Sequence, residues 1–371
     1  METLYPNLIL EALSKVRYPG TGKNIVEMEM VEDDMRIDGN RVEFSLIFER
    51  PTDPFIKSVV KAAEQAILTF ISPDVDIVGN IAVKTRAVAP APAPEVLPGV
   101  KNIIGISSGK GGVGKSTVAA NLAVALAREG YRVGLLDADI FGPSVPKMFG
   151  IEDEQLYMHE VDGRNLIIPI ERYGVKLLSI GLVIDPEKAA VWRGSMASNA
   201  LKQLIEQGDW GELDYFLIDM PPGTSDIHLT LVQTLGITGA VIVTTPQEVA
   251  LADARKGISM FRDPKIDVPV LGIVDNMAWF TPEIHPDERY YIFGDIKAVD
   301  KLAEQYDASV LLHIPLVAAV GDHNDGGKPI ALEESNIMAG IFSHLAHEVV
   351  DAVDERNSNL PPTIKVNVSH K

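Results

Sequence analysis

The 371-residue sequence contains no cysteine. Disulfide bonds are therefore impossible, and no side chain of this protein can supply a thiolate as a nucleophile or as a metal ligand. Aromatic residues are also scarce, at 6% of the chain, although hydrophobic residues make up 46%. This balance indicates a core built mainly from aliphatic side chains, as in α/β proteins.

Basic residues are in the minority, with 33 Lys and Arg against 52 Asp and Glu, and the formal net charge is −19. Nucleic-acid-binding surfaces are usually basic, and anionic membranes attract basic segments, so this charge argues against both partners. No hydrophobic run reaches the roughly 18 residues of a transmembrane helix. The first five residues lack the basic start of a signal peptide. We therefore expect a cytoplasmic protein that binds neither nucleic acid nor membrane.

A glycine-rich segment follows a short hydrophobic run at residues 103–106. Gly109, Gly114, Lys115 and Ser116 match the pattern Gly-x-x-x-x-Gly-Lys-Ser/Thr, and a helical pattern begins directly after it. The segment therefore predicts a strand, a phosphate-binding loop and a helix N-terminus that together hold a nucleoside triphosphate. The residues expected to contact the nucleotide are Gly109, Lys110, Gly111, Gly112, Val113, Gly114, Lys115, Ser116 and Thr117.

The residue types in this loop suit phosphate binding. Glycines lack a Cβ, so backbone N–H groups can turn toward phosphate oxygens. Lys115 is expected to reach the β- and γ-phosphates, and the Ser116 hydroxyl to bind Mg²⁺. Two roles stay open for Thr117, namely a hydrogen bond to the α-phosphate or a cap of the helix. Lys110 is not required by the pattern, and as a loop residue it could simply be a solvated charge.

Three carboxylates follow predicted strands. Asp137 ends the hydrophobic strand at residues 132–137, and Asp139 follows it closely. Asp219 ends the strand at residues 214–219. Polar side chains at the carboxyl ends of parallel strands face the ligand crevice. We expect Asp137 and Asp219 to hold Mg²⁺ through water, and Asp139 to orient the attacking water or, alternatively, to cap the next helix.

Two further places are predicted to respond to the nucleotide. Pro222 and Gly223 form a turn after a strand, where the Gly223 N–H could sense the γ-phosphate and act as a switch. Asn276 ends a later strand, and its amide has the donor and acceptor that suit an adenine edge; a turn-forming asparagine is the alternative. His313 ends the next strand and could lie against the base.

The predicted elements divide the chain into two domains. Residues 1–86 give the order α-β-β-α-β, an α+β domain whose first strand is expected at residues 25–30. Residues 87–99 are rich in alternating Ala and Pro and predict an extended linker. Residues 100–356 alternate strands and helices, which predicts a mostly parallel, doubly wound sheet, and residues 357–371 an extended tail. The strands of the larger domain are expected at residues 102–107, 132–137, 174–180, 214–219, 239–244, 269–275 and 309–314.

The loop Gly-Lys-Gly-Gly-Val-Gly-Lys-Ser resembles the deviant Walker A loop of the MinD septum-site, ParA chromosome-partition and nitrogenase iron protein ATPases. This resemblance implies a P-loop NTPase fold and a homodimer that sandwiches ATP. It also implies that Lys110 reaches the nucleotide of the partner subunit, where it would stabilise transition-state charge as an arginine finger does. Lys110, Lys115 and Asp139 are accordingly the expected catalytic residues, and ATP and Mg²⁺ the expected ligands.

The whole chain resembles bacterial members of the Mrp/ApbC family of iron–sulfur cluster carrier ATPases. The small first domain is similar to one found in iron–sulfur maturation systems. The resemblance implies a role in cluster assembly or transfer, with maturation proteins or client apoproteins as partners. It implies no particular role for Arg193. The matching segments are residues 109–116, 137–144, 192–194, 218–226, 275–277 and 292–294.

The sequence departs from this family at the cluster site. Members hold the cluster with a Cys-x-x-Cys pair in each subunit, shortly before the triplet at residues 292–294, and this chain has no cysteine there. Glu283, His285, Asp287 and Glu288 could bind a harder metal instead, or form an ordinary polar loop. We therefore predict an ATPase of cluster assembly whose own cluster ligation is doubtful. The alternatives are a ParA/MinD-like positioning ATPase and a small-molecule ligase of the dethiobiotin-synthetase type.

Overall fold

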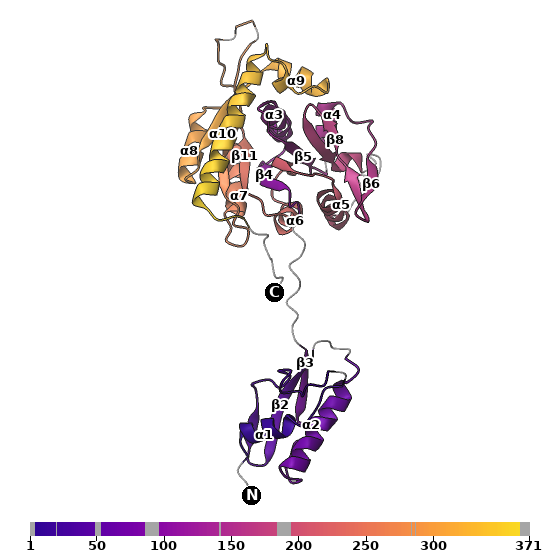
Figure 1. Ribbon diagram of the computed structural model, residues 1–371. Coiled ribbons are helices and arrows are strands. Elements are labelled where there is room, and N and C mark those ends of the chain that lie inside the picture. Colours follow the sequence, from indigo (N-terminus) through magenta and orange to yellow (C-terminus); the bar gives the residue numbers. More distant parts are fainter. Residues whose placement is uncertain are drawn as a thin grey trace. The chain divides into compact units, whose positions relative to one another are not determined.

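The computed structural model describes residues 4–19, 21–48, 53–85, 96–140, 142–183, 194–282, 284–285 and 287–363. The chain forms two compact units, residues 1–94 and 95–371, and each has its own hydrophobic core (Figure 1). Most of the predicted linker lies outside the described residues. Its last part differs from the prediction, because Val96 and Leu97 pack against the core of the larger unit.

The small unit has the predicted α-β-β-α-β order, but its first strand lies elsewhere. Residues 25–29 form turns, and the strand expected at residues 25–30 is wrong. The Asn24 side chain accepts hydrogen bonds from the backbone N–H groups of Val26 (3.0 Å) and Glu27 (2.8 Å), which bends the chain into a turn. The elements are α1 (Pro6–Leu13), β1 (Arg36–Asp38), β2 (Arg41–Phe48), α2 (Ile56–Phe70) and β3 (Ile81–Thr85).

The large unit is built around an eight-stranded sheet in the order β13-β12-β11-β4-β10-β5-β9-β8. All strands from β13 to β9 run parallel, and only the edge strand β8 is antiparallel, so the predicted doubly wound sheet is confirmed. Every predicted strand of this unit is present. The strands are β4 (Val100–Ser107), β5 (Val133–Asp137), β8 (Ile170–Arg172), β9 (Val175–Ser179), β10 (Leu213–Asp219), β11 (Gly239–Thr244), β12 (Val270–Phe280) and β13 (Val310–Leu316).

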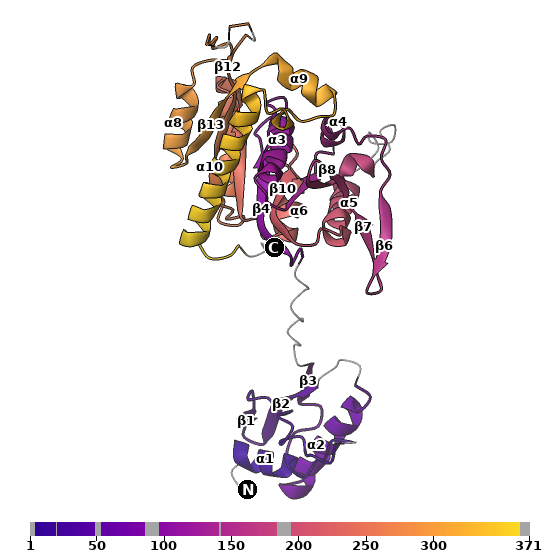
Figure 2. The same cartoon turned by 45° about the horizontal axis from the view of Figure 1, so that its top comes forward.

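Helices cover both faces of this sheet, as Figure 2 shows. Helices α3 and α10 pack on one face with α4, and helices α5 to α8 contribute to the core on the other face. Helix α10 runs three residues into the segment expected to be an extended tail, so that part of the prediction is wrong. The helices are α3 (Lys115–Arg128), α4 (Val145–Phe149), α5 (Gly194–Gln207), α6 (Asp226–Thr234), α7 (Glu248–Phe261), α8 (Lys297–Gln305), α9 (Ala318–Asp325) and α10 (Ile337–Asn359).

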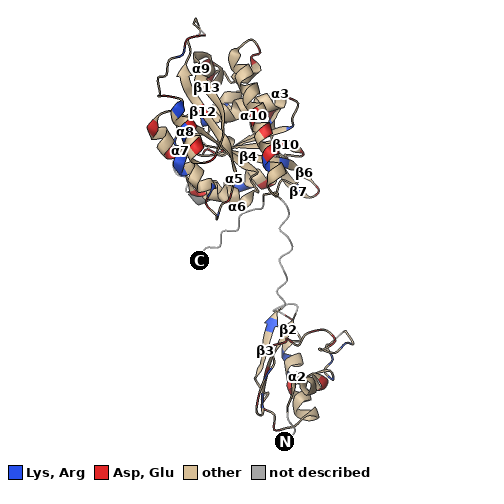
Figure 3. Ribbon diagram, turned by 90° about the vertical axis from the view of Figure 1, so that its left-hand side faces the viewer, with Lys and Arg blue, Asp and Glu red and all other residues tan. Residues whose placement is uncertain are grey.

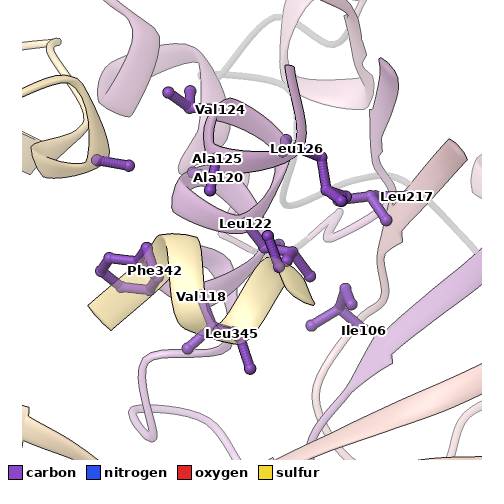
Figure 4. Close-up of a cluster of buried hydrophobic side chains, with 14 of the residues drawn as sticks. Ile106, Val118, Ala120, Leu122, Val124, Ala125, Leu126, Leu217, Phe342 and Leu345 are labelled. Carbon is purple, nitrogen blue, oxygen red and sulfur yellow. The ribbon is translucent and has the colours of Figure 1, made fainter. Parts of the chain in front are cut away.

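Helix α3, which follows the glycine-rich loop, is deeply buried against the sheet. Its residues from Val118 to Leu126 are all buried. Figure 4 shows why: α3 lies between the strand residues Ile106 and Leu217 on one side and Phe342 and Leu345 of α10 on the other. Burial of apolar surface contributes about 25 cal/mol per Å² to the stability of the folded state. The buried body of α3 therefore holds the N-terminus of the helix firmly at the edge of the sheet.

Two antiparallel hairpins were not predicted. One joins β6 (Tyr157–Val161) to β7 (Arg164–Ile168), and the other joins β8 to β9. The first turns at Asp162 and Gly163, which both have positive φ, and this Asp-Gly pair is a known hairpin signal.

Charged side chains lie mostly on helices and loops, while β12 and β13 are drawn mainly in tan in Figure 3. No helix in the described part of the chain could cross a bilayer.

Candidate nucleotide-binding site

The glycine-rich loop leaves the middle of the sheet, where β4 lies between β11 and β10. Gly112 and Gly114 have φ of +81° and +82°, which side chains with a Cβ rarely adopt. A Cβ on Gly114 would also lie 2.2 Å from Nδ2 of Asn276. The backbone conformation thus explains why glycine occupies both positions, and it directs the loop toward the N-terminus of α3.

Gly109 is required by close packing rather than by φ. A Cβ at this position would lie 2.1 Å from the carbonyl carbon of Asp253 and 2.5 Å from the backbone nitrogen of Ala254, both in α7. These are backbone atoms, so no side-chain rotation could relieve the clash. The phosphate loop therefore rests directly on α7, with no room for a side chain between them.

We expect Gly109→Ala to lower the free energy of unfolding by about 1–3 kcal/mol, because the loop or α7 must move. Gly111→Ala is the matched control, since a Cβ there has nothing within 4 Å and Gly111 lacks a positive φ. The control should change the unfolding free energy by no more than about 0.5 kcal/mol. Urea unfolding without nucleotide measures both, and equal losses in the two variants would contradict the packing explanation.

Lys115 lies buried among the predicted catalytic and metal-binding groups. Its Nζ donates a hydrogen bond to Oδ1 of Asp219 at 2.5 Å and lies 3.7 Å from Oδ2 of Asp139. It also lies 3.3 Å from the Ser116 hydroxyl. The structure thus brings Lys115, Ser116, Asp139 and Asp219 together at the carboxyl ends of neighbouring strands, although they are up to about a hundred residues apart in sequence.

Asp137 completes this group from β5. It is fully buried and accepts hydrogen bonds from the Ser179 hydroxyl (2.9 Å) and the Asp139 backbone N–H (3.1 Å). Burial, together with the nearby Asp219 carboxylate, raises the pKa of Asp137 to about 8. Burial also raises the pKa of Asp219, although Lys115 opposes the shift. Three carboxyl groups therefore lie near a single ammonium, and a divalent cation would favour their ionised forms.

The available oxygens suit Mg²⁺. Oδ1 of Asp139 and Oδ2 of Asp219 are buried and have no hydrogen-bond partner in the described structure. With the Ser116 hydroxyl they form a set of hard oxygen donors. Among the described residues, however, no three His, Asp or Glu side chains converge closely enough to hold a metal ion by themselves. An ion here would therefore be held partly through water and phosphate oxygens, as Mg²⁺ usually is.

The lack of three converging metal ligands among the described residues also applies to the segment just before residues 292–294. His285, Asp287 and Glu288 do not form a metal site, and Glu283 lies outside the described residues. At either end of this segment, Phe280 and Tyr290 exchange two backbone hydrogen bonds. The alternative of a harder metal held by this segment is therefore unsupported. Arg193, from another matching segment, also lies outside the described residues.

The remaining predicted residues contact the protein around the loop. Nδ2 of Asn276 donates to the Val113 carbonyl oxygen at 2.8 Å, so this amide braces the phosphate loop. The backbone N–H of Gly223, after Pro222, donates to the Ser108 carbonyl oxygen at 2.8 Å. The Thr117 hydroxyl accepts a hydrogen bond from Nδ2 of Asn324. Thr117 is thus tied to α9, a structural contact that sequence reasoning did not predict.

Lys110 is placed by a residue that sequence reasoning missed. Its Nζ donates to Oε1 of Gln247 at 3.3 Å, and Gln247 immediately precedes α7. Ser179, which supports Asp137, was missed as well. Ser179 lies near the carboxyl end of the strand predicted at residues 174–180, and Gln247 follows the strand predicted at residues 239–244. The rule that identified the three aspartates could therefore also have identified both residues.

Comparisons with known proteins identify the family of this chain. A family model described as NUBPL iron-transfer P-loop NTPase matches residues 99–350, and an iron–sulfur cluster assembly protein model matches residues 7–77. The iron–sulfur cluster carrier protein of Synechocystis is 41% identical over 94% of this chain and 98% of its own. The carrier protein of Escherichia coli is 49% identical over 68% of this chain and 66% of its own.

Solved structures support the same fold. A nucleotide-binding protein of Archaeoglobus fulgidus in complex with ADP is 38% identical, with a TM-score of 0.54, over 64% of this chain and 89% of its own. The septum-site protein MinD of Pyrococcus horikoshii with Mg-ADP is 25% identical, with a TM-score of 0.52, over 69% of this chain and 98% of its own. The predicted resemblance is confirmed, and the chain belongs to the NUBPL iron-transfer P-loop NTPase family, together with the iron–sulfur cluster carrier proteins that it matches along most of its length.

Proposed function

We propose that this protein is a cytoplasmic, Mg²⁺-dependent ATPase that works as a homodimer in iron–sulfur cluster assembly. The observation that carries the proposal is the buried contact between Lys115 and Asp219, with Asp139 beside it, directly below a glycine-rich loop. A buried ammonium at this position is available to a polyphosphate, and the carboxylates beside it remain able to interact with a metal–water shell. Family membership supports the choice of iron–sulfur assembly.

The residues of the site divide the work of hydrolysis. The loop backbone from Gly109 to Gly114 and the N-terminus of α3 would bind phosphate oxygens. Lys115 would exchange its hydrogen bond with Asp219 for one with the β- and γ-phosphates. Ser116, with Asp137 and Asp219 through water, would hold Mg²⁺, which would supply positive charge to offset that of the phosphates. Asp139 would accept a hydrogen bond from the attacking water and orient it.

Two contacts would have to change between states. The Gly223 N–H, now donated to Ser108, would be released to contact the γ-phosphate, which makes the turn at Pro222 and Gly223 the switch. Lys110, now donated to Gln247, would be released to reach the nucleotide of a second subunit. The Asn276 nitrogen holds the loop, so its amide oxygen is the group that could accept a hydrogen bond from the adenine amino group.

The cluster itself is cargo, and this chain lacks the usual ligands for it. With no cysteine in the sequence and no group of three His, Asp or Glu ligands among the described residues, thiolates of another protein would have to hold a cluster. We therefore propose that ATP turnover drives a scaffold or chaperone step on a cluster-bearing maturation protein or client. The small unit, which matches the assembly-protein model, is a candidate contact for that partner.

Anaerobic reconstitution with iron and sulfide tests this part of the proposal. We expect fewer than about 0.2 clusters per chain after desalting, because no thiolate is present. Iron and sulfide analysis, with absorbance near the charge-transfer bands, measures the yield, and a cysteine-ligated cluster protein serves as the positive control. A stoichiometric cluster that transfers to an apoprotein would contradict it. ATP turnover, measured with and without Mg²⁺, tests the ATPase separately.

A further inference from the structure

An acid–histidine pair joins the middle of β12 to the middle of β13, directly before Asn276 but outside the proposed chemistry. Asp275 and His313 face each other in the strand register, and Oδ2 of Asp275 lies 2.7 Å from Nδ1 of His313. The other ring nitrogen lies 3.4 Å from Oδ1 of Asp300 in α8. The imidazole therefore connects two neighbouring strands to a helix that covers the sheet.

The burial of Asp275 makes its contact with His313 important for stability. The Asp275 side chain is 0% exposed, and its Oδ1 is buried without a hydrogen-bond partner in the described structure. A buried carboxylate is costly unless it is paired. His313 is the partner that the structure provides, so loss of the imidazole would leave Asp275 unsupported and this part of β12 free to rearrange.

The next residue connects this pair to the nucleotide site. Asn276 follows Asp275 and donates to the Val113 carbonyl oxygen of the phosphate loop at 2.8 Å. Directly after it, Met277 adopts φ of +55°, and the pairing of β12 with β13 becomes irregular until Phe280. A residue other than glycine is strained at a positive φ, so contacts of the neighbouring residues must hold Met277 in this conformation. The Asp275–His313 contact lies in the regular part of the β12–β13 pairing, one residue before the last regular pair, Asn276 and Ile314.

We propose that His313 is a positioning residue for nucleotide binding, because its contact with Asp275 holds the middle of β12 and keeps Asn276 on the phosphate loop. The inference rests on the nucleotide site proposed above. His313 contacts neither phosphate nor metal in this scheme. Its effect on nucleotide binding is transmitted through Asp275 and Asn276, two successive residues of β12.

The contact also depends on protonation. Asp275 of β12 and Asp300 of α8 face the imidazole, and hydrogen bonding and charge from these two carboxylates raise the pKa of His313. Burial raises the pKa of Asp275, although the hydrogen bond from His313 opposes the shift. A raised histidine pKa means that the stabilising contact is complete at low pH and is lost as pH rises through that pKa. Nucleotide affinity should therefore decline on the alkaline side.

Binding of a non-hydrolysable ATP analogue with Mg²⁺, from about pH 6 to about pH 10, tests the inference in the full chain. We expect His313→Ala to weaken binding about tenfold at pH 7 and to lose part of the alkaline decline. His313→Asn keeps a donor near the Nδ1 position without a titrating proton, so it should stay within about threefold of the wild type with a flatter profile.

His347→Gln is the matched control, because this exposed histidine of α10 also lies near a carboxylate, 3.4 Å from Glu129. It should reproduce the wild-type pH profile. If the wild type binds the analogue and His313→Ala has the same affinity and pH profile as the wild type, the inference is overturned and the proposed function stays intact. Failure of the wild type to bind the analogue would instead overturn the proposed function. Thermal unfolding of each variant shows whether the fold is retained, and His313→Asn serves if His313→Ala is unfolded.

Discussion

Replacing Lys115 by alanine is expected to abolish measurable nucleotide binding. Lys115 is the only cation within 4 Å of the described carboxylates at this site, where its Nζ contacts Asp219 at 2.5 Å and Asp139 at 3.7 Å. Without it, a triphosphate would face aspartates with no ammonium to offset them. Two lost charge-assisted hydrogen bonds, each worth about 1.5–3 kcal/mol, weaken binding by about 100-fold or more. Titration with a fluorescent ATP analogue measures the dissociation constant.

The same substitution should destabilise the fold, because it leaves the fully buried Asp219 without its partner. Removing one member of a buried ion pair typically costs about 3–5 kcal/mol, and uptake of a proton by Asp219 reduces that cost. Lys115→Met combined with Asp219→Asn removes both charges and keeps the volume. This double variant should recover most of the unfolding free energy but none of the nucleotide binding. If it binds nucleotide as the wild type does, Lys115 is not the phosphate ligand.

The residues that sequence predicts best are those whose signal is local. The phosphate loop and the strand that ends at Asp219 are defined by adjacent residues, since runs of aliphatic side chains buried on both faces identify parallel strands. The strand predicted at residues 25–30 shows the limit of this reasoning. Its hydrophobic residues suit a strand, but the side chain of the preceding Asn24 satisfies two backbone donors and makes a turn.

Contacts across the site depend on strand order, which a single sequence does not specify. The chain inserts β10 between β4 and β5, and this brings Asp219 beside both Lys115 and Asp137. Strand β12 lies next to β13, which pairs Asp275 with His313. The expectation that Asn276 faces the nucleotide stays a prediction, because the structure shows its amide nitrogen on the loop instead. Such long-range partners follow from topology rather than from residue spacing.

Lys110→Ala should have a different signature from Lys115→Ala, with hydrolysis lost and binding kept. Within one chain Lys110 contacts Gln247 rather than the buried carboxylates, so its removal leaves the Lys115 cluster intact. If Lys110 stabilises transition-state charge on the nucleotide of a partner subunit, its loss should lower kcat by about 10³-fold. The dissociation constant for the ATP analogue should stay within about threefold of the wild type. Steady-state phosphate release measures the first quantity and equilibrium titration the second.

Mixing two inactive variants distinguishes action across subunits from action within one. Asp139→Ala is expected to bind ATP but not to orient water, so it lacks a function that Lys110→Ala retains. In a mixed dimer, the subunit that carries the Lys110→Ala substitution keeps its own Asp139 and receives Lys110 from its partner, which completes one of the two sites. A 1:1 mixture that exchanges freely should therefore recover about a quarter of wild-type turnover. No recovery, with subunit exchange shown independently, would mean that Lys110 acts within its own chain.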